Sequence, residues 1–326
     1  MEPFKHVENE KDVLELLTVS LKHEWAVSLE YIIHAYSMPK GKYFYHDPVV
    51  DAALDMRAQT IQIGIDEMYH ALQMGLVVRQ MGVFPTFQTD EVIRYPRIVD
   101  NLQRNRMTED LVTALYQKSK IREGAFPQVQ NMFWNIAADE VRHSRQFQAM
   151  VETLKSSGQA EALCFQPDPK AEEKEEVRLL HQVTGSENEL MHRYLYYVLL
   201  FSEHQDLGWR LFKNSIDHMR HWDKNSGLLL KLGSLLRLEN AERRPDGSER
   251  SLKSMPDIYP GKDRLSALET LSPAEERLIA RYEEIIRLFP DGENKEQLKF
   301  HLMQNREHLF TQEWLLKNAR AVKGLV

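Results

Sequence analysis

The chain has 326 residues, a net charge of −7 and a single cysteine, Cys164. This length favours two domains of about 150 residues each. One thiol excludes an intramolecular disulfide and a cysteine-rich zinc or iron–sulfur site, and it favours a reducing cytoplasm. The acidic balance argues against nucleic acid as the main partner, and the longest apolar run, residues 195–201, is too short to span a membrane. We therefore expect a soluble, cytoplasmic protein.

Apolar residues recur at helical spacing along the whole chain, and glycine and proline number only 14 and 13. This pattern predicts an all-α fold with essentially no strands. A first helix, which ends near Met38, carries Glu24 on its apolar stripe. A second helix, over residues 48–82, carries Glu67 and His70 on its apolar face.

The following segment, residues 82–100, contains two prolines and mixed polar residues, which suits a long crossover between helices. A third helix is expected to end near residue 124 and a fourth near Gly158. The fourth helix places Glu140 and His143 on its apolar stripe. Residues three apart share a helix face, so each of the two Glu-x-x-His motifs presents a carboxylate and an imidazole side by side.

A polar segment, residues 155–186, is typical of an interdomain linker, and the helical pattern begins again after it. The run Ile-Asp-Glu-Met-Tyr-His at residues 65–70 reappears as Ile-Asp-His-Met-Arg-His at residues 216–221. We interpret this recurrence as the internal duplication of a four-helix unit, with domains at residues 1–165 and 166–326. Later helices are expected over residues 187–204 and 208–238, followed by a polar loop and a helical hairpin that turns at residues 290–292.

The carboxylates on these apolar stripes create a charge problem in the core. A buried ionised carboxylate costs on the order of several kcal/mol unless it is paired or bound to a metal. Glu24, Glu67 and Glu140 would face a common centre, together with His70 and His143. Carboxylate and imidazole ligands suit iron, with manganese as the alternative, and two divalent ions would balance four carboxylates.

The fourth carboxylate follows from the position of a turn. The hairpin between the third and fourth helices is expected near residues 125–127, about fourteen residues before Glu140, so its partner should lie about as far before the turn. This arithmetic favours Glu109, with Asp110 adjacent to it. Glu123, on the same helix face, would lie about 20 Å further along the helix axis at 1.5 Å per residue, unless the turn falls near Asn131.

Two of these stretches resemble the ferritin-like di-iron carboxylate superfamily. Residues 136–143, Ile-Ala-Ala-Asp-Glu-Val-Arg-His, are similar to the corresponding helix of soluble acyl-carrier-protein desaturases, and residues 66–70 resemble the second helix of many members. Residues 10–155 would cover one four-helix unit, so that the chain would form two tandem ferritin-like four-helix bundles. The resemblance implies the following roles: Glu24 as a terminal ligand, Glu67 and Glu140 as bridging ligands at the catalytic centre, and His70 and His143 as terminal imidazoles.

The same resemblance implies a non-haem di-iron oxidase or oxygenase, with two iron ions that activate O₂ to oxidise a small organic substrate. It leaves a homodimer open as the assembly. A ferroxidase or iron-buffering protein without an organic substrate is the second hypothesis. A helical scaffold with a structural metal site is the third.

The C-terminal unit departs from the pattern. His218 stands where the first unit has Glu67, and Asn305 stands where it has Glu140. Losing both bridging carboxylates favours a degenerate copy that serves as a packing partner. The alternative is a mononuclear site, formed by His218, His221, His308 and by Glu189 in place of Glu24.

Overall fold

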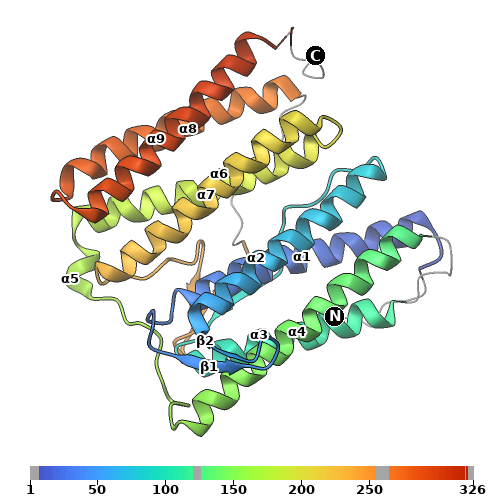
Figure 1. The fold of residues 1–326 in the computed structure, drawn as a ribbon, viewed down its shortest axis with the longest axis vertical. Helices are drawn as coiled ribbons and strands as arrows, with labels where there is room; N and C mark the ends of the chain where they lie inside the picture. The colour runs from blue at the N-terminus through green and yellow to red at the C-terminus, as the bar shows by residue number, and fades with distance from the viewer. Residues whose placement is uncertain (1–6, 120–125, 254–263, 320, 322–326) are drawn as a thin grey trace. The chain divides into compact units, whose positions relative to one another are not determined.

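A computed structural model describes residues 7–119, 126–253, 264–319 and 321 of the chain. It divides the chain into two compact units (Figure 1). Unit 1 comprises Met1–Gln166 and Arg237–Met255, and unit 2 comprises Pro167–Leu236 and Pro256–Val326. Residues 237–255, which the sequence assigned to the second domain, therefore belong with the first unit. Within the described residues, no helix is long and apolar enough to cross a membrane.

Unit 1 is built around four long helices that pack in pairs. Helix α1 packs along α2 and α3, and α4 packs along α3 and α2 (Figure 1). The elements of this unit are α1 (Glu10–Ala35), β1 (Phe44–Asp47), β2 (Ala52–Asp55), α2 (Met56–Gln80), β3 (Val92–Arg94), α3 (Ile98–Lys118), α4 (Pro127–Ser156), β4 (Glu242–Arg243) and β5 (Glu249–Ser251).

Unit 2 repeats this pairing. Helix α6 packs along α7 and α8, and α9 packs along α8 and α7. The elements are α5 (Pro169–Glu172), α6 (Glu175–Leu200), α7 (Gln205–Lys231), α8 (Arg264–Leu288) and α9 (Glu293–Lys317). The prediction of a mostly helical chain is confirmed, and the last two helices meet at the expected turn, residues 290–292.

The prediction that strands are missing is wrong in three places. The first is the segment just before the second helix. Strands β1 and β2 form an antiparallel hairpin there, so α2 begins at Met56 instead of following Pro48. The Asp47 carboxylate accepts the backbone N–H groups of Val49 and Val50, at 2.7 and 3.1 Å, which closes the turn. The same carboxylate accepts the side-chain amide of Gln146 at 2.7 Å, so the hairpin is joined to α4.

The other strands lie in the crossover and in residues 237–255. Strand β5 pairs with both β3 and β4, and an Arg94–Glu249 ion pair joins the crossover to β5. The backbone N–H of Ile93 donates to the buried carboxylate of Glu30 on α1 at 2.8 Å. These contacts hold the crossover against α1 and explain why residues 237–253 fold with unit 1.

Helix α6 begins at residue 175, inside the segment predicted as a linker. Its acidic first turn, with Glu175 and Glu176, is favoured by the positive end of the helix dipole. Val177, Leu180 and Val183 follow on one buried face. The acidic run thus marks a helix N-terminus, and the connection between the units is correspondingly shorter.

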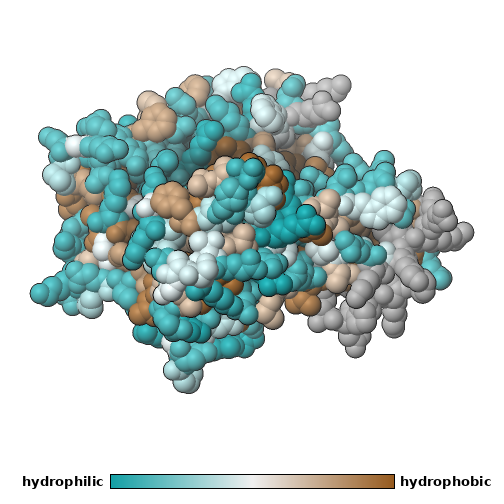
Figure 2. Space-filling view, turned by 60° about the horizontal axis from the view of Figure 1, so that its bottom comes forward, coloured by the Kyte–Doolittle hydropathy of each residue, from teal (hydrophilic) through white to brown (hydrophobic). Residues whose placement is uncertain are grey.

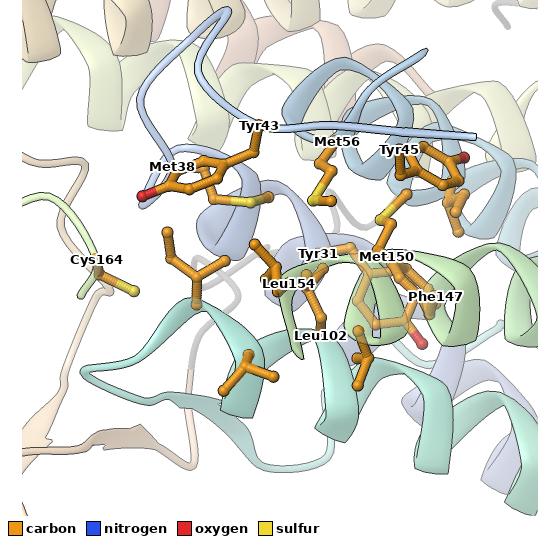
Figure 3. Close-up of a cluster of buried hydrophobic side chains, with 14 of the residues drawn as sticks. Tyr31, Met38, Tyr43, Tyr45, Met56, Leu102, Phe147, Met150, Leu154 and Cys164 are labelled. Atoms are coloured by element: carbon orange, nitrogen blue, oxygen red, sulfur yellow. The ribbon is translucent and has the colours of Figure 1, made fainter. Parts of the chain in front are cut away.

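The core of unit 1 lies between the long helices and the β1–β2 hairpin. Figure 3 shows Tyr31 and Phe147 against each other, with Met150 beside them. The two rings meet edge to face with their centroids 5.1 Å apart. On the face seen in Figure 2, by contrast, hydrophilic side chains surround scattered hydrophobic ones.

Helices α1 and α2 approach each other closely at Gly64. A Cβ atom on this residue would lie 2.9 Å from Cγ1 of Ile32 and 3.1 Å from the backbone oxygen of Ser28. Only glycine allows this distance, and it lies one turn before Glu67. The close approach therefore positions the two helices that carry Glu24 and Glu67.

We predict that Gly64→Ala lowers the free energy of unfolding by about 1–3 kcal/mol, because the added methyl group overpacks the helix interface. Gly208→Ala is the matched control, since its Cβ would meet only the Phe201 carbonyl oxygen at 3.5 Å. Removing a helical glycine there should be neutral or stabilising by up to about 1 kcal/mol. Urea denaturation followed by circular dichroism measures both. Equal stability of the two variants would contradict the close packing.

Candidate metal centre

Four helices of unit 1 bring six side chains together in the core. All six side chains are fully or almost fully buried. They form two overlapping groups, within each of which the ligand atoms lie within 4.8 Å of one another. One group contains Glu24, Glu67, His70 and Glu140, and the other contains Glu67, Glu109, Glu140 and His143.

The carboxylates differ in how many histidines they reach. The two oxygens of Glu67 lie 2.8 Å from Nδ1 of His70 and 2.8 Å from Nδ1 of His143. Glu140 likewise presents Oε1 to His70, at 3.2 Å, and Oε2 to His143, at 3.7 Å. Both carboxylates therefore span the centre, as a ligand shared by two metal ions would.

Two further carboxylates each face one histidine. Glu24 Oε2 lies 3.7 Å from His70 Nδ1, and Glu109 Oε2 lies 3.8 Å from His143 Nδ1. The centre thus divides into two halves, each with one histidine and one carboxylate of its own. This arrangement has the donor set of two neighbouring metal positions with two shared carboxylates.

Several of these buried donor atoms make no hydrogen bond of acceptable geometry, although Glu67 Oε1 and His143 Nδ1 lie only 2.8 Å apart. Among the described residues, these atoms include Glu24 Oε2, Glu67 Oε1, Glu109 Oε2, both carboxylate oxygens of Glu140 and His143 Nδ1. Buried polar atoms are nearly always satisfied, and an unsatisfied set implies a missing ion or ligand. Oxygen and imidazole nitrogen donors that converge in a buried centre could hold a metal ion.

The outer nitrogens of both histidines face aspartates. His70 Nε2 lies 3.4 Å from Asp139, and His143 Nε2 lies 3.3 Å from Asp66. Arg142 forms ion pairs with Asp66 and Asp139, at 3.2 and 3.0 Å. At His70, the carboxylate of Asp139 favours a proton on Nε2 and leaves the Nδ1 lone pair facing the centre, which is the usual orientation of a metal-binding histidine. At His143, Nε2 also lies 3.2 Å from the Arg142 guanidinium.

Two tyrosines bind the terminal carboxylates across the unit. Tyr31 on α1 donates to Glu109 on α3, and Tyr116 on α3 donates to Glu24 on α1. Each hydroxyl satisfies one carboxylate oxygen and leaves the other oxygen, Oε2, directed toward the centre. Tyr69, which directly precedes His70 in the sequence, is by contrast 44% exposed.

The structure also distinguishes among the candidates for the fourth carboxylate. Glu109 lies in the buried group, and only 1% of its surface is exposed. Asp110 accepts the Ser144 hydroxyl at 2.6 Å, and its side chain is half exposed. Glu123 lies outside the described residues.

Charge crowding shifts the pKa values in this centre. Burial and the neighbouring Glu67 and Glu109 carboxylates raise the pKa of Glu140 well above its usual value. Burial by itself lowers the pKa of His70 and His143, but Glu67 and the other carboxylates outweigh it and raise both values well above the usual one. Without metal the centre therefore retains protons, and metal ions would displace them.

The equivalent centre of unit 2 differs from the prediction. Glu189 does not take part, because its side chain is partly exposed and pairs with Arg193 at 2.7 Å. The two fully buried carboxylates at this centre are Glu187 on α6 and Glu275 on α8. His218 lies between them, with Nδ1 2.5 Å from Glu187 and Nε2 3.0 Å from Glu275.

These two carboxylates hold His218 as a cation when no metal is bound. Burial alone would lower the pKa of His218, but Glu275 and Glu187 raise it to about 10. Burial would raise the pKa of Glu275, whereas His218 lowers it to about 2. Unit 2 therefore balances part of its buried charge internally through His218, as unit 1 does through His70 and His143.

A spacing signal for the missed carboxylates is present in the sequence. In four helices, a buried glutamate precedes a buried tyrosine by seven residues, two helical turns on one face. The pairs are Glu24 and Tyr31, Glu109 and Tyr116, Glu187 and Tyr194, and Glu275 and Tyr282. Glu189 and Tyr196 have the same spacing, but Gln182 and Ser186 on that face are polar, whereas the face of Glu187 includes Leu180 and Met191.

Comparison with known proteins does not identify a family for this chain. No protein-family model, curated protein or solved structure matches the chain.

We predict that Tyr31→Phe and Tyr116→Phe each lower the free energy of unfolding of the metal-free protein by about 1.5–3 kcal/mol, because each removes a buried hydrogen bond to a charged group. Each should also weaken divalent-metal binding by about 10–100-fold. Denaturation and metal titration measure the two effects. Tyr69→Phe, at the exposed position, should change neither. Unchanged metal affinity in both buried variants would show that these tyrosines do not orient ligands.

Proposed function

We propose that unit 1 is a ferritin-like four-helix bundle with a di-iron centre, and that the protein is a non-haem di-iron oxidase or oxygenase acting on a small organic substrate. The observation that carries this proposal is the pair of overlapping, buried Glu and His groups around His70 and His143. Several of their potential ligand atoms make no hydrogen bond. Unit 2, with the same helix pairing, is proposed as a second ferritin-like bundle. Manganese would fit the same donors.

In this proposal each half of the centre holds one ion. Glu24 and His70 would bind the first, Glu109 and His143 the second, and Glu67 and Glu140 would bind both. Two divalent ions carry four positive charges, which neutralise the four carboxylates. Reduced iron would supply the electrons for activating O₂.

The surrounding residues of this chain have positioning tasks. Tyr31 and Tyr116 hold one oxygen of each terminal carboxylate, and their pKa values, raised far above the usual one by burial and by the adjacent carboxylates, keep both hydroxyls protonated as donors. Asp139 and Asp66 would orient the imidazole rings of His70 and His143 through contacts at Nε2. Burial of the whole set excludes bulk water, so the ligands keep fixed orientations while iron changes charge.

A second candidate is a ferroxidase that oxidises iron without an organic substrate. Its support is the burial of the centre, since Glu24, Glu67 and His143 have no exposed surface and small reactants reach such a site most easily. Both candidates use the same six residues. They differ in whether O₂ consumption depends on an organic molecule.

We predict that replacing the shared ligands, in the double variant Glu67→Gln plus Glu140→Gln, removes two bound Fe²⁺ ions per chain relative to the unmodified protein. The substitutions keep side-chain size but delete the negative charges that hold two cations together. Anaerobic loading followed by elemental analysis gives the count. The control is Glu152→Gln plus Glu161→Gln, at exposed positions of the same unit, which should retain the full count. An unchanged count in the first variant would refute the centre.

We also predict that the anaerobic Fe²⁺ protein oxidises its iron rapidly on mixing with O₂, and that the Glu67→Gln plus Glu140→Gln variant does so no faster than free Fe²⁺. Stopped-flow near-ultraviolet absorption and an oxygen electrode measure the reaction. Continued O₂ consumption only when cell-extract metabolites and a reductant are present would support the oxidase or oxygenase. Consumption that stops at the iron equivalents, from a large shell in size-exclusion chromatography, would support the ferroxidase. No acceleration over free Fe²⁺ would contradict both.

A further inference from the structure

The two halves of the unit 2 centre differ in how many of their buried polar atoms have hydrogen-bond partners. In the half around Glu187, both carboxylate oxygens have donors: Tyr282 and Asn305 donate to Oε1 at 2.5 and 3.2 Å, and His218 lies 2.5 Å from Oε2. His221 Nε2 is hydrogen-bonded to the side chain of Gln304 at 2.9 Å. This half needs no further partner.

The half around Glu275 is open. Tyr194 donates to Glu275 Oε1 at 2.8 Å, but the second oxygen, Oε2, has no hydrogen-bond partner although the residue is fully buried. His308 Nδ1 also has no hydrogen-bond partner, and it lies 3.6 Å from Glu275 Oε1. His218 Nε2 lies 3.0 Å from the same carboxylate. A carboxylate and two imidazole nitrogens thus converge on one point.

The outer nitrogens of these two histidines face carboxylates. His218 Nδ1 lies 2.5 Å from Glu187, and His308 Nε2 lies 3.3 Å from the buried Asp217. A proton held at each of these outer nitrogens leaves a lone pair on His218 Nε2 and on His308 Nδ1. Carboxylate–histidine pairs of this kind orient metal-binding imidazoles.

The negative charge of the central carboxylates in unit 2 equals the positive charge of one divalent ion. Unit 1 has four central carboxylates, whereas unit 2 has two, Glu187 and Glu275, because His218 and Asn305 occupy the positions of the shared carboxylates. Two negative charges match one divalent cation, as four match two.

We propose that unit 2 holds one divalent transition-metal ion, of the Fe²⁺ to Zn²⁺ series, between Glu275, His218 and His308. Two imidazoles and one carboxylate form a donor set that such borderline ions favour over magnesium or calcium. The ion takes the place of the proton on His218 Nε2. This site is independent of the two-metal centre of unit 1, and it excludes Glu189 and His221, which the sequence suggested.

The test uses Co²⁺ as a spectroscopic probe in the full-length Glu67→Gln plus Glu140→Gln protein, in which the proposed two-metal site of unit 1 is removed. We expect one Co²⁺ per chain by elemental analysis, with visible absorption typical of nitrogen and oxygen ligands. Adding Glu275→Gln, which preserves an acceptor for Tyr194, should weaken Co²⁺ binding at least about 100-fold. Adding His308→Gln should do the same.

His192→Gln is the matched control, because His192 is a buried histidine of α6 outside the cluster. It should leave the Co²⁺ stoichiometry and spectrum unchanged, and circular dichroism verifies the fold of each variant. Absence of bound Co²⁺ in the parent variant, with a proton remaining on His218, would overturn the proposal. Binding that neither Glu275→Gln nor His308→Gln weakens would also overturn it. In the otherwise unmodified chain, Glu275→Gln should lose one metal and keep two, so failure of this site is distinguishable from failure of the unit 1 centre.

Discussion

The structure of unit 1 depends on four carboxylates buried at one level among four helices. The four carboxylates repel one another strongly in a dry interior. Burial, together with the charges of Glu67 and Glu109, raises the pKa of Glu140 well above its usual value. Two histidines supply partial compensation, and two tyrosines each satisfy one oxygen. Bound cations would balance the remaining negative charge, as proposed for this centre.

The two units solve the same charge problem in different ways. Both cross-link opposite helices through Glu–Tyr hydrogen bonds, such as Tyr31 with Glu109 in unit 1 and Tyr194 with Glu275 in unit 2. Unit 2 exchanges a shared carboxylate for His218, which lies between its two remaining carboxylates. This difference changes both the buried charge and the set of potential ligand atoms between two units that share the same helix pairing.

Local patterns allowed much of the helical framework to be predicted, whereas pairing between distant segments did not follow from them. Helical periodicity placed the two Glu-x-x-His motifs on buried faces, and turn arithmetic selected Glu109. The β1–β2 hairpin was missed because Asp47 closes its turn with short-range hydrogen bonds that helical periodicity does not reveal. The return of residues 237–255 to unit 1 depends on strand pairing with β3, more than 150 residues away in sequence, which no local pattern contains.

The sequence by itself determined which residue types face the core, because the repeat of an α-helix assigns each position to a face whatever lies opposite. Only the tertiary structure decided which faces meet. It placed Glu187 rather than Glu189 at the second centre, paired each tyrosine with the glutamate of the opposite helix, and left Glu275 and His308 with unpartnered atoms. These outcomes depend on distances between helices, and such distances are set by packing at contact points that are far apart along the chain.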